Sequence, residues 1–241
     1  MAPDPRPSAR PERICGGREP VLPVLAMSLH EGQVVLRGGA PLGQAAAALI
    51  LIHGRGASAE DIYSLGEEVS RGDPAVALLA PQAAGNAWYP QRFLAPLGLN
   101  EPQLSSALGV IAGLVAEAAQ AGPGYEGVVL LGFSQGACLA LEFAARNSRR
   151  YGGVVGLSGA LIGPPGAPRS LKGSLCGTPV YLGCSDRDAH IPLASVEESA
   201  AILERHGARV TTSIFPGMGH TVNAEELDAV RRIVRGLAPG V

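Results

Sequence analysis

A serine, an aspartate and a histidine that could cooperate in nucleophilic catalysis follow one another along this chain. Ser134 stands in Gly132-Phe133-Ser134-Gln135-Gly136, after the apolar run 128–131 and before the helix-forming stretch 137–143. A strand, a tight turn and a helix in this order form a nucleophile elbow, which exposes the serine hydroxyl. We therefore expect Ser134 to attack the carbonyl carbon of an ester or a related acyl group.

The pentapeptide is weak evidence by itself, because glycine makes up 33 of the 241 residues. A composition of this kind gives roughly 0.3 matches by chance in a chain of this length. The context adds the specificity. A buried-strand pattern precedes the motif, a helix follows it, and candidate acid and base residues come later in the order typical of this elbow.

A serine hydroxyl is a poor nucleophile at neutral pH, so it needs a general base that an acid orients. His220 is the candidate base, because it closes the glycine-rich loop 215–220 after the last expected strand. Loops at the carboxyl ends of parallel strands converge on one edge of a sheet. His30 and His206 have weaker contexts, and we expect no catalytic role for either.

The acid should follow the preceding strand, where Asp186 and Asp188 both stand in the loop 184–192. From the residues alone both remain candidates. The one that is not used is expected to pair with Arg187 or to cap the next helix, as loop aspartates often do. His190 is close enough in sequence to line the site, although it could equally be an ordinary loop residue.

Acyl transfer places negative charge on the carbonyl oxygen, and two preorganised N–H groups can stabilise that charge. The backbone N–H of Gln135, next to the nucleophile, is the first expected donor, and that of Arg55 in His53-Gly54-Arg55-Gly56 is the second. We expect His53 and Gly54 of this loop to contact the substrate. The Arg55 side chain is interpreted as a surface ion pair, with an anionic substrate group as its alternative partner.

Aromatic residues gather in the segment 87–97, in a chain that is only 4% aromatic. Trp88 and Tyr89 follow the end of an expected strand, so they could form the apolar wall of a pocket for an acyl or aryl group. The alternative is that these side chains simply pack over the core. The sequence does not decide between the two.

The elements that must position these residues alternate along the chain. Strands are expected at 33–36, 46–52, 75–79, 128–131, 153–157, 179–183 and 209–215, and further helices at 58–70, 102–119, 193–206 and 224–237. Alternation of this kind, with apolar strands, predicts an α/β fold with a mostly parallel sheet and helices on both faces. About twenty residues separate 158–160 from the next strand, too few for a large cap domain, so the site should be shallow and open.

Composition narrows the class of protein further. The formal net charge of -2, without a basic block, gives no footprint for nucleic acid or an anionic membrane. No apolar stretch reaches about 18 residues and nothing resembles a signal peptide, so we expect a cytoplasmic protein without stable membrane insertion. Residues 1–20 are expected to form a flexible N-terminal arm, and 21–241 a single domain.

The four cysteines, Cys15, Cys138, Cys176 and Cys184, lack zinc-like spacing. Three of them lie in or beside apolar segments, which favours buried free thiols in a reducing compartment over disulfides. We expect no metal and no cofactor, and a small-molecule ester as the partner. The oligomeric state stays open, with a homodimer as one alternative.

With these residues assembled, the chain resembles the phospholipase/carboxylesterase family of α/β-hydrolases, which includes acyl-protein thioesterases and is related to dienelactone hydrolases. The likeness runs from about residue 46 to 234. It rests on the motifs at 53–56, 132–136, 157–159, 188–192 and 217–220. In such enzymes the acid typically stands four residues before a proline, which selects Asp188, with Pro192 closing the pattern.

The resemblance implies a cofactor-free serine carboxylesterase for short- to medium-chain acyl or aryl esters, acting through an acyl-enzyme intermediate. Acyl-protein thioesterases usually have leucine between the two glycines of the oxyanion loop and aspartate after them. This chain has Arg55 and then Ala57-Ser58, which argues against protein depalmitoylation. A lysophospholipase and an acyl-(protein) thioesterase are the alternatives among enzymes, and a non-catalytic ligand-binding homologue is the alternative from another class.

Overall fold

The computed structural model describes residues 29–71, 73 and 75–237, so the expected arm at 1–20 lies outside the described residues. The described chain contains a sheet with the strand order β1-β3-β2-β4-β5-β6-β7. The strands are β1 Val35–Gly39, β2 Ala47–Ile52, β3 Val76–Pro81, β4 Val128–Phe133, β5 Gly153–Leu157, β6 Pro179–Ser185 and β7 Arg209–Phe215.

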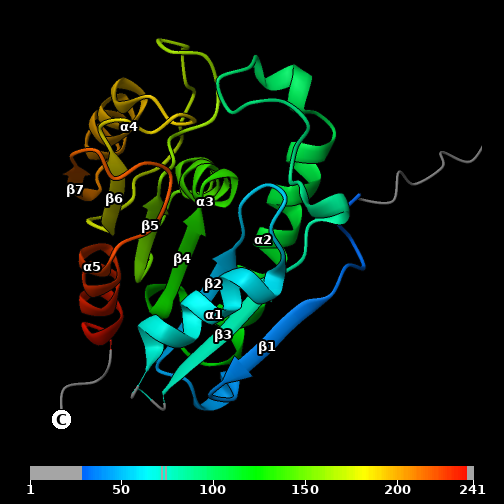
Figure 1. Cartoon of the computed structure of the whole chain (residues 1–241). Coiled ribbons are helices and arrows are strands. Elements are labelled where there is room, and N and C mark those ends of the chain that lie inside the picture. Colours follow the sequence, from blue (N-terminus) through cyan, green and yellow to red (C-terminus); the bar gives the residue numbers. More distant parts are fainter. Residues whose placement is uncertain (1–28, 72, 74, 238–241) are drawn as a thin grey trace, which may run out of the picture.

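The sheet is parallel except at one edge, where β1 runs antiparallel to β3. The carboxyl ends of β2, β3, β4, β6 and β7 therefore lie on the same edge of the sheet (Figure 1). The loops that carry the candidate residues all leave from this edge. The predicted mostly parallel sheet is confirmed.

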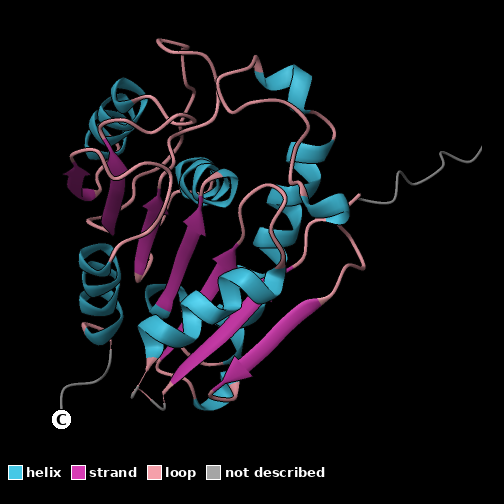
Figure 2. Ribbon diagram, viewed as in Figure 1, coloured by secondary structure: helices cyan, strands magenta, loops and turns pink. Residues whose placement is uncertain are grey.

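Helices cover both faces of the sheet, as Figure 2 shows. The helices are α1 Ala59–Ser70, α2 Gln103–Ala121, α3 Gln135–Arg146, α4 Leu193–Arg205 and α5 Ala224–Arg235. Ile62 of α1 and Val230 of α5 belong to a core cluster with Leu49 and Leu131 of the sheet. Ile111, Leu139 and Val196 of α2, α3 and α4 belong to a second cluster, with Ile50 and Leu130. Because successive strand residues point to opposite faces, the fully apolar strands supply both cores.

The first strand is the element that the sequence placed least well. Expected at 33–36, it lies at Val35–Gly39, and Val34 is 64% exposed. Gly38 and Gly39 have low strand propensity, but pairing places them opposite Leu78 and Ala77. Gly39 has a positive φ of 68°, and a Cβ there would lie 2.2 Å from the carbonyl oxygen of Val76, so the pairing of β1 with β3 requires glycine at this position.

Helix α2 is long and apolar enough to cross a membrane by length and composition, although the sequence was expected to contain no such stretch. Leu104, Ile111 and Leu114 on one side of α2 are buried in the core. Glu117 forms an exposed ion pair with Arg37 of β1. One side of α2 is buried and the other is exposed and carries Glu117, as in a core helix packed on a sheet.

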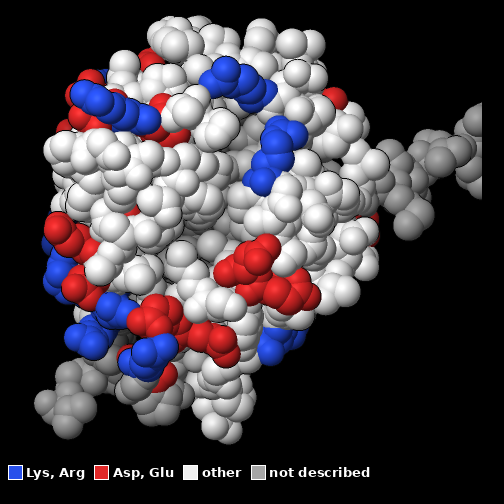
Figure 3. Space-filling model, viewed as in Figure 1, with Lys and Arg blue, Asp and Glu red and all other residues white. Residues whose placement is uncertain are grey.

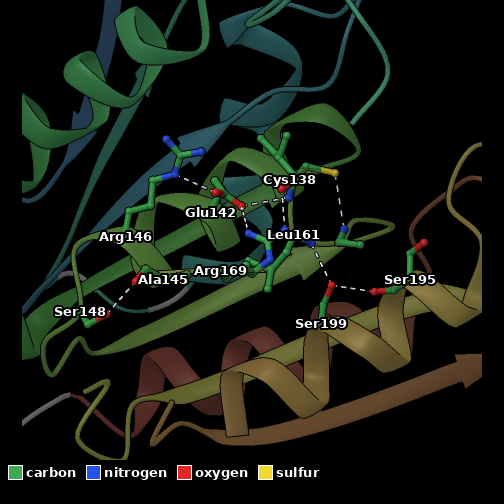
Figure 4. Close-up of polar contacts among 11 residues, drawn as sticks. Cys138, Glu142, Ala145, Arg146, Ser148, Leu161, Arg169, Ser195 and Ser199 are labelled. Carbon is green, nitrogen blue, oxygen red and sulfur yellow. Dashed lines mark hydrogen bonds and ion pairs between the residues drawn. The ribbon is translucent and has the colours of Figure 1, made fainter. Parts of the chain in front are cut away.

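The connection 158–178 has no helix or strand of its own and is held against α3 by a buried carboxylate. Glu142 is 2% exposed and accepts hydrogen bonds from Arg146, from Arg169 and from the backbone N–H of Ile162 (Figure 4). Arg169 also donates to the carbonyl of Ile162. This connection is too short and too closely bound for a large cap, as predicted.

The cysteines agree only in part with the expectation of buried thiols. Cys138 and Cys184 are buried and free, whereas Cys176 is free but exposed in the loop before β6. The apolar neighbours of Cys176 in sequence misled the prediction, because Leu175 alone turns into the core. Cys15 lies outside the described residues.

Candidate active site

Ser134 occupies a sharp turn between β4 and α3, with backbone angles φ 55 and ψ -117. Non-glycine residues rarely adopt positive φ, and such strain persists only where surrounding contacts impose it. The backbone N–H of Ser134 donates to the carbonyl of Leu157 at 2.9 Å, and its carbonyl accepts from Cys138 at 3.0 Å. The turn is thus fixed by β5 on one side and by the first turn of α3 on the other.

The two glycines of the pentapeptide allow the backbone to pack closely at this turn. A Cβ on Gly132 would lie 2.2 Å from the carbonyl oxygen of Gly136. A Cβ on Gly136 would lie 2.0 Å from the carbonyl oxygen of Ile52, at the end of β2. Only glycine fits at either position, which gives a physical reason for the spacing of the motif.

The structure brings together the three side chains that the sequence singled out. His220 Nε2 lies 2.8 Å from Ser134 Oγ, and His220 Nδ1 lies 2.7 Å from Asp188 Oδ2. Because Asp188 accepts a hydrogen bond from Nδ1–H, the proton of the neutral imidazole stays on Nδ1, and Nε2 is left as the acceptor for the serine hydroxyl. These distances are those of a nucleophile, a general base and an orienting acid.

Asp188 is held as an anion. Burial by itself raises the pKa of this carboxyl, but hydrogen bonds from His220 and from the N–H groups of His190 and Ile191 lower the pKa below its usual value. The side chain of Asp188 is fully buried, whereas that of His220 is 20% exposed. A buried carboxylate with fixed partners orients the imidazole and stabilises it when it is protonated.

Asp186 does not take either of the roles expected of the unused carboxylate. Its Oδ1 accepts a hydrogen bond from the N–H of Gly217 at 2.7 Å, in the loop that carries His220. Pro192 caps α4 without a side-chain bond, and Asp186 forms no ion pair with Arg187 among the described residues. The sequence missed this contact because it joins two loops far apart along the chain.

The loop 53–56 lies against the nucleophile. A Cβ on Gly54 would lie 3.3 Å from the Cβ of Ser134, so this glycine permits a close approach. The backbone N–H of Arg55 has no acceptor among the described residues. Gln135 is the first residue of α3, where N–H groups have no intrahelical acceptor. These are the two donors that the sequence proposed for an oxyanion.

His53 positions this loop. It is fully buried, donates from Nδ1 to the carbonyl of Gly54 at 2.7 Å, and accepts at Nε2 from the N–H of Ala83. Burial lowers the pKa of His53, which favours the neutral ring that these two bonds need. His53 does not line the cavity beside Ser134, but it lines a second cavity on the other side of His220.

Arg55 and Gln135 both bind the backbone of the aromatic segment. Nη2 of Arg55 donates to the carbonyls of Tyr89 at 2.6 Å and Gln91 at 2.8 Å. The Gln135 side chain donates to the same Tyr89 carbonyl and accepts from the N–H of Trp88. The expected surface ion pair of Arg55 is wrong, because carbonyl oxygens and not a carboxylate hold its guanidinium.

A cavity of about 300 Å³ opens beside Ser134. It is lined by Gly54, Arg55, Ala57, Tyr89, Gln91, Arg92, Phe93, Phe133, Ser134, Gln135, Cys138, His190, Ile191 and His220. Figure 3 shows a hollow on this face, over the start of α3. Gly54, Tyr89 and His190 line the cavity, as the sequence suggested.

Trp88 was a candidate for the wall of the pocket, and the structure contradicts this. Its side chain is fully buried, and Nε1 donates to the carbonyl of His53 at 2.9 Å. The residue therefore packs under the oxyanion loop and does not line the cavity. Phe93, Cys138 and Ile191 were missed as lining residues, and no local pattern would have found them, because three separate elements bring them together.

A second cavity, of about 330 Å³, lies on the other side of His220. It shares Gly54, Ala57, Phe133 and His220 with the first, and adds side chains of α1 and of the loop after His220. Asp61 of α1 lines this second cavity. The candidate base thus stands between two cavities.

The two remaining histidines have structural contacts. His30 is buried and bonds through both ring nitrogens, at Nε2 to the carbonyl of Trp88 and at Nδ1 to the N–H of Ala84. His206 bonds to Ser148. Neither lines the cavity beside Ser134, as expected. Among the described residues no group of three or more His, Cys, Asp or Glu is arranged to hold a metal ion.

The sheet order and the strand-turn-helix at Ser134 define an α/β-hydrolase. The Phospholipase/Carboxylesterase family pattern matches residues 39–237, and the chain belongs to this family. The resemblance seen in the motifs is thereby confirmed. The protein is a hydrolase of the carboxylesterase and thioesterase class.

Similar proteins are known from several organisms. A phospholipase/carboxylesterase from Dyadobacter fermentans is 38% identical, with a TM-score of 0.79 over 84% of this chain and 96% of that chain. The mouse lysophospholipase-like protein 1 is 25% identical over 83% of this chain and 90% of its own. Acyl-protein thioesterase 1 of Gibberella zeae is 32% identical, but that match covers 47% of this chain and 49% of the relative, about half of each.

Proposed function

We propose that this protein is a serine carboxylesterase that hydrolyses short- to medium-chain acyl or aryl esters through an acyl-enzyme on Ser134. The observation that carries the proposal is the unbroken contact from Ser134 through His220 to Asp188 at the wall of a cavity. Membership of the family supports ester hydrolysis as the class of reaction.

The proposed mechanism has two half-reactions, acylation of Ser134 and hydrolysis of the acyl-enzyme, and the same side chains act in both. Ser134 Oγ attacks the carbonyl carbon while its proton moves to His220 Nε2, and Asp188 stabilises the imidazolium. The N–H groups of Gln135 and Arg55 donate to the oxyanion. His220 then protonates the leaving alcohol, and water, activated by the same imidazole, releases the acid from the serine.

The size of the cavity supports the proposed acyl length. About 300 Å³ lies at the low end of the range for small-molecule sites. The described residues add no large cap over it, so long chains would extend into solvent. The names of relatives nevertheless favour a lysophospholipase or an acyl thioesterase as second candidates.

We also propose a cytoplasmic location and a small-molecule ester as the partner. The free buried thiols of Cys138 and Cys184 support a reducing compartment. The formal net charge of -2 supports neither nucleic acid nor an anionic membrane as a partner.

The test is hydrolysis of a ladder of p-nitrophenyl esters from acetate to palmitate. We expect kcat/KM to peak among short and medium chains and to be lost in Ser134→Ala. Ser64→Ala, at an exposed position of α1, is the control and should retain the activity.

Two outcomes separate the candidates. A peak at long chains would favour the lipid or thioester alternatives. Activity that survives in Ser134→Ala, or no hydrolysis of any ester by the folded protein, would contradict the proposal and leave the non-catalytic homologue.

A further inference from the structure

The cavity beside Ser134 has an unusual balance of charge. Its lining includes the guanidinium groups of Arg55 and Arg92 and no aspartate or glutamate. The remaining walls are largely apolar, with Tyr89, Phe93 and Ile191 among them. A neutral acyl chain would need no such charge, so the two arginines require an explanation.

Arg55 is a positioned cation without a counter-ion. Its Nη2 is fixed by two backbone carbonyls, which are neutral, and it forms no ion pair among the described residues. Neither Nε nor Nη1 has an acceptor there. A guanidinium held this way keeps its positive charge and retains N–H donors for a carboxylate, which it binds more strongly than a neutral acceptor.

Arg92 is also a cation without a counter-ion among the described residues. Its Nη2 has a long contact, 3.4 Å, with the carbonyl of His190, and the described residues give it no ion pair. Figure 3 shows basic side chains beside the hollow and a group of acidic side chains on its opposite side. This face therefore has opposite charges on the two sides of the hollow.

The second cavity is lined by a charged group of the opposite sign. Asp61 lines it and no arginine or lysine does. Its Oδ2 accepts from the N–H and the hydroxyl of Ser58 in the capping box of α1, and no cationic side chain forms an ion pair with it in the part of the chain that the structure describes. An anionic group is disfavoured on this side of His220 and favoured on the other.

The geometry assigns the acyl group to the first cavity. The nucleophile Ser134 and both oxyanion residues, Arg55 and Gln135, line the first cavity and none of them lines the second. The acyl group stays bonded to the serine after the alcohol has left. The leaving oxygen takes its proton from His220, and the second cavity opens on that residue.

We propose that the esters hydrolysed at this site carry a carboxylate on the acyl part, bound by Arg55 with Arg92 beside it. The preferred substrates are then monoesters of dicarboxylic acids. This inference rests on the proposed function, because it names the substrate class of the same site.

The test compares mono-4-nitrophenyl adipate with 4-nitrophenyl heptanoate, in which an ethyl group replaces the carboxyl. The measured quantity is the ratio of kcat/KM for the two esters in wild type, Arg55→Gln and Arg55→Lys. We expect the ratio to fall about tenfold in Arg55→Gln, as the loss of one charge-assisted hydrogen bond predicts. Lysine keeps the charge and should preserve most of the ratio.

An effect of Arg55 on the oxyanion loop would lower kcat/KM for both esters equally, so it cancels in the ratio. Arg92→Gln, and a rise in ionic strength from 20 to 500 mM, which shortens the screening length by a factor of about five, should lower the ratio in the same direction. An unchanged ratio in both glutamine variants would overturn the inference while heptanoate hydrolysis upheld the proposed function.

The inference would also be overturned if Arg55 recognised a carboxylate on the alcohol part of the ester. If Arg55→Gln instead affected 3-acetoxybenzoate against phenyl acetate, with the adipate ratio constant, the carboxylate would belong to the leaving group. If wild type hydrolysed none of these esters, the proposed function would fail and this inference with it.

Discussion

At the scale of single residues, catalysis depends on which carboxylate faces His220. Asp188 contacts Nδ1, whereas Asp186 binds the backbone of Gly217. We predict that Asp188→Asn lowers kcat by a factor of about 10³–10⁴, because the amide no longer holds the imidazole in the required tautomer. Steady-state kinetics on a p-nitrophenyl ester measure this.

The matched variant is Asp186→Asn. Asparagine keeps an oxygen that can accept from Gly217 N–H, so we expect a far smaller loss of kcat. Should Asp186→Asn cost more activity than Asp188→Asn, the acid assignment would be reversed. Both variants should unfold at temperatures close to that of the wild type, which shows that activity and not folding is measured.

Residue types and local motifs predicted the positions of Ser134 and His220 and narrowed the acid to Asp186 or Asp188, because the chemistry demands particular groups after particular strands. The family resemblance then selected Asp188. Neither could predict the partners of the Arg55 side chain. Those partners are backbone carbonyls of another loop, and a carbonyl leaves no trace in the sequence. For the same reason the sequence did not decide between a pocket wall and core packing for Trp88, which packs beneath the loop 53–56.

At the scale of elements, the turn between β4 and α3 requires glycine at 136. We predict that Gly136→Ala lowers the free energy of unfolding by several kcal/mol, about 3 or more, because its Cβ would lie 2.0 Å from the carbonyl oxygen of Ile52. Gly109→Ala is the control. It lies in α2 with open space around it, so alanine should stabilise by about 0.5–1 kcal/mol.

Urea denaturation of both alanine variants gives the two free energies. Equal and small changes would mean that the elbow tolerates a side chain, which would contradict the packing described. A soluble expression failure of Gly136→Ala alone, with Gly109→Ala folded, would agree with it.

The attachment of the 158–178 connection to α3 is a second property of elements. We predict that Glu142→Ala costs about 3–5 kcal/mol, because it leaves Arg169 and the N–H of Ile162 without their buried acceptor. Arg146→Ala removes only a partly exposed partner, 32% accessible, and should cost under about 1 kcal/mol. A thermal melt of the two variants compares them, and a larger loss in Arg146→Ala would refute this.

Elements with a strong apolar pattern were predicted well, and the exceptions have a physical cause. The buried strands β2, β3 and β4 follow uninterrupted apolar runs that admit one interpretation. Strand β1 was misplaced because Gly38 and Gly39 are poor strand formers that pair only once β3 is present. Tertiary pairing of this kind is not visible in a local window.

At the scale of the whole molecule, alternation of strands and helices was enough to predict the parallel sheet and the shared edge for the active-site loops. The charge separation between the two cavities was not predictable, because Arg55 and Arg92 come from two different connections to line one cavity, whereas Asp61, in the same connection as Arg55, lines the other. Sequence gives their charges, and only the folded sheet gives their places.

The stability of the molecule should depend on pH through His30 and His53. Burial lowers the pKa of both imidazoles, and each accepts a backbone hydrogen bond that protonation would remove. The unfolded chain binds protons at these side chains near pH 6.5, about their ordinary value, and the folded chain only at lower pH. The contribution of these two histidines to the free energy of unfolding is therefore fully present above about pH 6.5 and is lost as the pH decreases below that value.

Urea denaturation between pH 8 and pH 5 measures this slope. Burial raises the pKa of Glu226, which acts in the opposite direction, so the readout is the part of the slope that His53→Asn removes. That variant should be less stable at pH 8 and show a shallower decline. An equal slope in wild type and variant would contradict the account of His53.

Catalysis at this site requires that Ser134 becomes acylated with the help of His220. Labelling of the folded protein with a fluorophosphonate, followed by peptide mass spectrometry, tests this. We expect one adduct, on Ser134, and labelling that is strongly slowed in His220→Ala while Ser64→Ala labels as fast as the wild type. An adduct on another residue, no adduct on the folded wild type, or equal labelling rates with and without His220 would contradict the claim.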